Sequence, residues 1–186
     1  PDSVFPFKRV RGKIALLGAN PGRATLPFLA TGSFRSEQEK ALGALLEKSR
    51  DEGLFRVVMI HHPPFAGATS TAKRLVGAAR FRKMINRYGA EMILHGHTHL
   101  DSFEWIDGPD HPVPVVGVPS ASQRPAAQDE KLEHGHSKPA ARYNLFDISG
   151  VAENWSCEMR EFGFSSGSGV SEIARCDIYR NGKTCR

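Results

Sequence analysis

The sequence has few cysteines and no long apolar run. Its 186 residues include 3 cysteines, which are Cys157, Cys176 and Cys185. They form neither the Cys-x-x-Cys pairs of a zinc site nor an even disulfide set, so we expect ordinary thiols in a reducing compartment, the cytoplasm. No stretch reaches the ~20 apolar residues of a membrane span, and none resembles a signal peptide. A membrane partner is therefore not expected.

A basic stripe interleaved with aromatic residues is also missing. The formal net charge is +5 and the pI is about 9.3, a balance that favours anionic partners. However, the Lys and Arg residues fall mainly in two predicted helices and near the carboxyl terminus. Those between residues 72 and 88 are interpreted as one solvent-exposed helix face. Nucleic acid is therefore not an expected partner.

Strands and helices alternate along the chain. Short β-branched and apolar runs predict strands at residues 5–10, 13–17, 55–60, 91–94, 103–106, 113–118, 142–148 and 155–164. Apolar periodicity predicts helices at residues 36–52 and 72–88. This alternation is typical of an α/β fold, with the later strands antiparallel.

The predicted boundaries rest on local signals. Ser36 and Glu39 have the spacing of a capping box, which predicts a helix start, and Gly53 predicts its end. Residues 1–162 are expected to form the folded domain. Residues 163–186 are expected to be a Ser/Gly linker followed by a polar tail.

Histidines follow two of the predicted buried strands. His61 and His62 follow residues 55–60, and His95, His97 and His99 follow residues 91–94. Ligands of α/β sheets collect beyond the carboxyl ends of the strands, and imidazole is a good ligand for transition metals. In extended geometry the side chains of His97 and His99 leave on one face. This pattern predicts a metal site made of His61, His97 and His99.

The remaining histidines have simpler interpretations. His62 or His95 alone could satisfy backbone groups at the sheet edge. His111, His134 and His136 lie in predicted loops and are expected to face solvent, although His136 could reach a substrate.

The two histidine motifs together resemble a family. The strings His61-His62-Pro63-Pro64 and Gly96-His97-Thr98-His99 resemble the later motifs of the calcineurin-like metallophosphoesterases. The resemblance extends over residues 57–148. It implies a partial metallophosphoesterase-type α/β/β/α sandwich, the second half of that fold.

The resemblance also implies the roles of the histidines. His61 and His97 correspond to ligands of the second metal, and His99 corresponds to a ligand of the first. His62 is expected to approach the phosphate or the leaving group, as the catalytic candidate, while His95 supports the ligands. The complete enzyme would hold two divalent or trivalent ions of manganese, iron or zinc. It would hydrolyse a phosphodiester or phosphomonoester substrate with a two-metal-activated hydroxide.

The first half of the family pattern is absent from the sequence. The strings Asp-x-His, Gly-Asp-x-x-Asp and Gly-Asn-His-Asp do not occur, and the chain opens with Pro1 rather than Met. Two cations ~4 Å apart need anionic ligands, which three neutral imidazoles do not supply. We therefore expect an amino-terminal half of the same domain to act as a partner that supplies the remaining ligands. The isolated chain is expected to be inactive.

Two other functions stay open from the sequence. The string from His95 to Asp101 is similar to the His-x-His-x-Asp-His box of metallo-β-lactamase-type hydrolases, but Asp101 does not precede a histidine. A non-catalytic scaffold that retains part of the fold for protein binding is the other alternative. Metal analysis separates the scaffold from both enzymes.

Overall fold

The computed structural model describes residues 4–122, 139–165, 169–180 and 182–184. The chain divides into two compact units. The first comprises Pro1–Thr98 and Phe103–Val116, and the second comprises His99–Ser102 and Gly117–Arg186. Both the α/β class and the strand-rich later part confirm the fold class predicted from the sequence.

A six-stranded sheet organises the first unit, in the order β1-β2-β4-β6-β8-β7. Its strands are β1 (Phe7–Arg11), β2 (Ile14–Ala19), β4 (Phe55–Ile60), β6 (Met92–His95), β7 (Ser102–Ile106) and β8 (Val113–Gly117). β1 and β2 form an antiparallel hairpin, whereas β2, β4 and β6 run parallel. The carboxyl ends of β4 and β6 therefore lie at the same edge of the sheet, as predicted.

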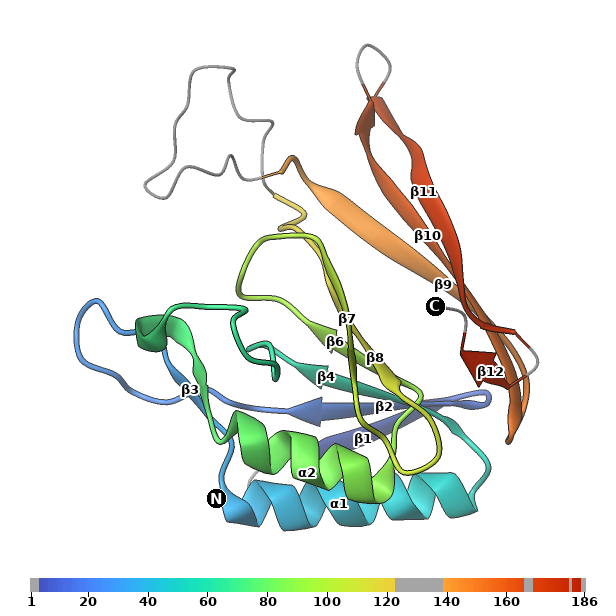
Figure 1. The fold of residues 1–186 in the computed structure, drawn as a ribbon, viewed down its shortest axis with the longest axis horizontal. Coiled ribbons are helices and arrows are strands. Elements are labelled where there is room, and N and C mark those ends of the chain that lie inside the picture. Colours follow the sequence, from blue (N-terminus) through green and yellow to red (C-terminus); the bar gives the residue numbers. More distant parts are fainter. Residues whose placement is uncertain (1–3, 123–138, 166–168, 181, 185–186) are drawn as a thin grey trace. The chain divides into compact units, whose positions relative to one another are not determined.

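Two helices lie side by side against one face of this sheet (Figure 1). They are α1 (Ser36–Asp51) and α2 (Ala78–Tyr88). Their apolar residues meet alternate residues of the central strands in one core, which includes Leu17, Leu42, Leu46, Val58, Ile60, Phe81, Ile85 and Ile93. The helices thus fix the parallel strands from one side.

The start of α1 differs from the prediction. Arg35 is the N-cap residue and no side chain caps the helix, so the predicted capping box is wrong. The Ser36 hydroxyl instead donates to the Glu37 carboxylate over 3.3 Å. The predicted end of the helix is confirmed, since Gly53 adopts a φ of 65° and donates its N–H to Arg50 O.

The segment predicted as one helix over residues 72–88 is three elements. A 3₁₀ turn (Thr71–Lys73) and a short strand β5 (Leu75–Val76) precede α2. β5 pairs in parallel with β3 (Gly32–Ser33), and Gly77 turns the chain into α2 with a φ of 92°. Backbone pairing with a distant segment therefore replaces the first helical turns.

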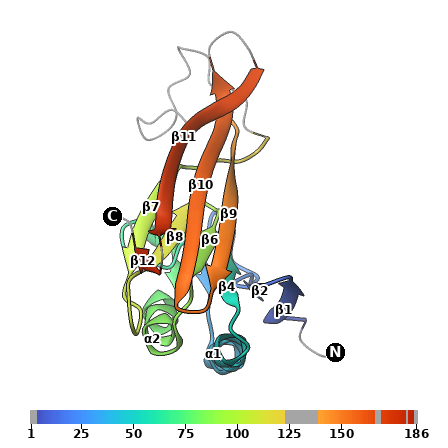
Figure 2. The ribbon, with the colours of Figure 1, turned by 90° about the vertical axis from the view of Figure 1, so that its right-hand side faces the viewer.

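The second unit contains an antiparallel sheet in the order β12-β11-β10-β9, whose long strands β9, β10 and β11 run side by side (Figure 2). The strands are β9 (Arg142–Val151), β10 (Asn154–Ser165), β11 (Gly169–Arg180) and β12 (Lys183–Thr184). The sequence predicts a Ser/Gly linker and a polar tail over residues 163–186, but most of this segment belongs to the paired strands β10, β11 and β12.

The histidines predicted to lie in solvent-facing loops can be compared with the structure only in part. His134 and His136 lie outside the described residues, whereas His111 is half-buried rather than solvent-facing.

Among the described helices, none is long and apolar enough to cross a membrane.

Candidate metal centre

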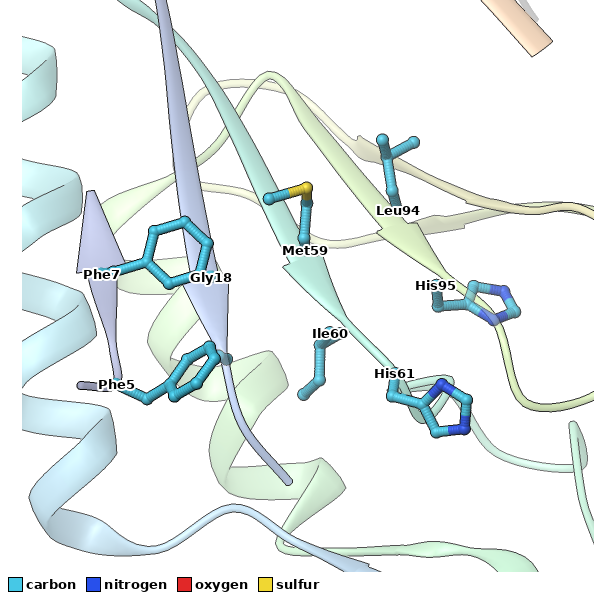
Figure 3. Close-up of a pocket in the computed structure, with 9 residues that line it drawn as sticks. Phe5, Phe7, Gly18, Met59, Ile60, His61, Leu94 and His95 are labelled. Carbon is cyan, nitrogen blue, oxygen red and sulfur yellow. The ribbon is translucent and has the colours of Figure 1, made fainter. Parts of the chain in front are cut away.

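Two strand ends hold the histidines of the first unit. His61 directly follows β4 and His95 is the last residue of β6, and both side chains are visible beyond the strands in Figure 3. The Gly96 N–H donates to His61 O over 3.1 Å, which extends the pairing of the two strands by one step. The parallel sheet thus places both histidine motifs at one edge.

The backbone turns sharply at His97. The Thr98 N–H donates to Gly96 O over 2.8 Å, and His97 between them has a φ of 70°. An i to i+2 hydrogen bond around a residue with positive φ is a rare, strained turn, and such strain concentrates at functional sites. His99 also has a positive φ, of 57°. The predicted extended geometry of His97 and His99 is therefore wrong.

Hydrogen bonds determine which ring nitrogen carries the proton in His97 and in His61. His97 Nε2 lies 2.9 Å from Lys73 O, and a carbonyl only accepts, so Nε2 carries the proton and Nδ1 carries the lone pair. His97 Nδ1 lies 3.3 Å from His61 Nε2. His61 Nε2–H consequently donates to His97 Nδ1.

His97 is neutral at neutral pH. Burial, followed by the neighbouring His62 and His61, lowers the pKa of His97 to about 4, and its hydrogen bond to Lys73 O opposes this only in part. A neutral imidazole with a fixed lone pair is the form that binds a metal ion.

His62 lies behind this pair. Its ring is buried and packs against His97, with 4.1 Å between ring centroids and 30° between ring planes. Nε2–H donates to Ala30 O over 2.9 Å, while the buried Nδ1 has no hydrogen-bond partner among the described residues. The predicted approach of His62 to the phosphate or leaving group stays a prediction.

His95 is buried at the end of β6. Its ring packs edge-on against Phe65, and Nδ1–H donates to Gly96 O over 3.0 Å. Burial is also the largest cause that lowers the pKa of His95. Its surroundings are those of a residue that supports the turn, although that role stays a prediction.

An open pocket of about 330 Å³ lies beside His61 and His95 (Figure 3). Phe5, Phe7, Met59 and Leu94 give it an apolar lining. Gly18 also lines it, and the Phe7 ring packs directly on Gly18, because a Cβ there would lie 2.2 Å from that ring.

One pair of imidazole nitrogens has the spacing of two ligands of one metal ion. Two nitrogens that each bind a tetrahedral ion at ~2.0–2.1 Å are ~3.3–3.4 Å apart, which matches the separation of His61 Nε2 and His97 Nδ1. Among the described residues, however, no group of three or more His, Cys, Asp or Glu side chains is arranged to hold a metal ion. His99 belongs to the second unit, and its role as a ligand stays a prediction.

Comparison with known proteins identifies the segment that carries these histidines. The family model described as calcineurin-like phosphoesterase matches residues 11–101. This segment is similar to the calcineurin-like phosphoesterases. The match includes both histidine clusters, but it begins and ends earlier than the predicted resemblance over residues 57–148 and overlaps it in residues 57–101. Calcineurin-like phosphoesterases generally use divalent metals and act on phosphate esters. No curated protein matches the chain.

Sequence reasoning missed the groups that orient the rings. The acceptors for His62 and His97 are main-chain carbonyls, Ala30 O and Lys73 O, which carry no residue signature. Gly32, which packs against His62, reads in the sequence as an ordinary loop glycine. Only the pairing of β3 with β5 brings these groups beside the histidines.

Proposed function

We propose that the chain provides the histidine side of a metal-dependent phosphoesterase that hydrolyses a phosphodiester or phosphomonoester. The observation that carries the proposal is the pairing of His61 Nε2 with His97 Nδ1 at 3.3 Å, at the carboxyl edge of a calcineurin-like phosphoesterase segment. His61, His97 and His99 are the proposed ligands. The ions are manganese, iron or zinc, which all accept imidazole and carboxylate ligands.

The metals and the residues have separate tasks in this proposal. When bound, divalent ions supply positive charge for phosphoryl oxygens and a nucleophile from water at neutral pH. His97 keeps Nδ1 unprotonated because Nε2–H is held by Lys73 O. To bind an ion through Nε2, His61 would carry its proton on Nδ1 instead of donating Nε2–H to His97. The apolar pocket beside His61 offers a surface for the organic part of an ester.

A further part of the proposal is that carboxylates come from an amino-terminal half of the same domain. Three imidazoles carry no negative charge, and two divalent cations ~4 Å apart repel strongly without anionic ligands. The chain by itself should therefore bind one ion weakly and show no turnover.

Metal content and hydrolysis test the proposal together. The purified chain, alone and joined to a candidate amino-terminal half, is analysed by plasma mass spectrometry and assayed with bis(p-nitrophenyl) phosphate. Two ions and turnover only with both halves are expected. Full turnover by the chain alone would refute the need for a second half. Metal-free, inactive protein in both states would favour the non-catalytic scaffold.

His62 needs a test of its own. If it meets the phosphate or the leaving group, His62→Ala lowers turnover by the joined protein more than metal content. If it only holds His97 in place, metal content and turnover fall together. His111→Ala is the matched control, since His111 lies outside both histidine motifs and its ring contacts Pro112 O, and neither quantity should change.

A further inference from the structure

Gly32 lies in β3 without a backbone reason to be glycine. Its φ is outside the positive region, and its N–H donates to Arg74 O over 3.1 Å in the pairing with β5. An alanine would accept this conformation. Glycine within a strand often marks a place where another group approaches closely.

That group is the ring of His62. A Cβ on Gly32 would lie 2.6 Å from His62 Nδ1 and 2.8 Å from both Cγ and Cε1. The ring therefore lies flat against the main chain of β3.

Further contacts hold the His62 ring in this position. It also packs against His97, with 4.1 Å between the ring centroids, and its Nε2–H donates to Ala30 O. Ala30 and Gly32 are themselves hydrogen-bonded to Ala72 O and Arg74 O, on either side of Lys73, whose carbonyl holds His97. The paired segments thus hold both imidazoles through one continuous set of contacts.

We propose that Gly32 is a positioning residue of the histidine site. Its lack of a side chain lets His62 pack between β3 and His97, and this packing keeps His97 Nδ1 directed at His61. The inference rests on the proposed function for its importance, but the positioning itself is measurable in the metal-free chain.

The test compares Gly32→Ala with Gly43→Ala. A Cβ on Gly43 in α1 would lie 2.7 Å from the Tyr88 ring, so this control adds a similar crowding away from the histidines. Ring ¹⁵N NMR signals of His62 and His97 should shift in Gly32→Ala only. Zn²⁺ affinity, measured by titration, should fall about 10-fold or more in Gly32→Ala, the range found when a group that orients a ligand is lost. Gly43→Ala should lower stability and leave the affinity unchanged.

A double-mutant cycle shows whether the effect passes through His62. With the His62 ring removed, Gly32→Ala should have no further effect, so the double variant should match His62→Ala in His97 signals and Zn²⁺ affinity. If Gly32→Ala does not fold, the double variant should fold, because the clash is gone. Unchanged His97 signals in Gly32→Ala, additive effects, or failure of both variants to fold would overturn the proposal.

The result is separable from the proposed function. If the signals and affinity respond as expected but the joined protein hydrolyses no phosphate ester, the phosphoesterase proposal fails and the positioning role stands.

Discussion

At the scale of single residues, the backbone of His97 is the most constrained feature of the site. A left-handed conformation costs roughly 1–2 kcal/mol for most L-residues, and Asn tolerates it better than Ala because its side chain bonds locally. His97→Asn should therefore be more stable than His97→Ala by about 1 kcal/mol. Both should lose Zn²⁺ binding equally. Urea unfolding and zinc titration measure these quantities, and equal stability of the two variants would mean that the positive φ is not retained.

The cysteines offer a second prediction at this scale. Cys157 is buried in β10, and burial is the largest cause that raises the pKa of its thiol to about 12, whereas Cys176 in β11 is exposed. Because the thiolate is the reactive form, iodoacetamide at mildly alkaline pH should modify Cys176 and spare Cys157. Peptide mapping by mass spectrometry measures the two sites. Concentrated urea should make both reactive, and equal rates in the folded protein would contradict the burial of Cys157.

The same pKa shift gives Cys157 a dependence of stability on pH. A thiol whose pKa is raised on folding contributes stability below its unfolded pKa, and that contribution is lost as the pH rises toward about 12. Cys157→Ala should therefore remove part of the alkaline loss of stability, as measured by urea unfolding at a series of pH values. Cys176→Ala should remove a smaller part of this loss, because the neighbouring Cys176 is the second cause, after burial, of the raised pKa of Cys157.

At the scale of elements, a buried ion pair fixes β4 against β6. Arg56 at the start of β4 donates two hydrogen bonds to the carboxylate of Glu91, at 2.9 and 2.7 Å, and a third to Tyr88 O. The Arg56 main-chain N–H also donates to Glu91, and the Glu91 N–H donates to Arg56 O. These contacts set the register of the two strands that end in the histidines.

Loss of one partner should be costly. Glu91→Ala leaves a buried guanidinium unpaired and should lower the free energy of unfolding by about 3–5 kcal/mol. Glu91→Gln retains the shape and one acceptor and should cost less. Glu52→Ala, which removes a surface pair with Lys8, should cost at most about 1 kcal/mol. Urea unfolding measures the stability of each variant. Similar losses of stability for Glu91→Ala and Glu52→Ala would contradict the role of the Arg56–Glu91 ion pair.

Elements with strong local composition were predictable from the sequence. The apolar runs of β4 and β6, the hairpin of β1 and β2, and the glycine that ends α1 all carry local signals, and the structure confirms them. Because parallel strands end at one edge, the meeting of His61 with His97 was also predictable.

Features that depend on distant partners were not predictable. Leu75 has a helical spacing with α2 but belongs to β5 because it pairs with Gly32. β11 is largely exposed and polar, and its pairing with β10 makes it a strand. At the site, the left-handed turn at His97 and the carbonyls of Ala30 and Lys73 likewise follow from tertiary structure.

At the scale of the whole molecule, metal binding should be linked to folding. A ligand that binds only the folded state raises the free energy of unfolding by about 2.7 kcal/mol when its concentration is about 100 times its Kd. Zn²⁺ should therefore raise the Tm of the chain, and His61→Ala or His97→Ala should abolish the shift. Differential scanning calorimetry with Zn²⁺ and with Mg²⁺ as control measures it, since imidazole ligands favour Zn²⁺ over Mg²⁺. A shift that survives both variants would place the binding elsewhere.

Strand β1 has a consequence for the behaviour of the protein at high concentration. It is the edge of the six-stranded sheet, and three of its five residues are cationic, Lys8, Arg9 and Arg11. An edge strand exposes unpaired main-chain groups to other molecules, and charged side chains discourage them from adding a further strand. Lys8, Arg9 and Arg11, which add to the positive charge of the chain, thus also oppose aggregation through pairing of this edge strand with other molecules.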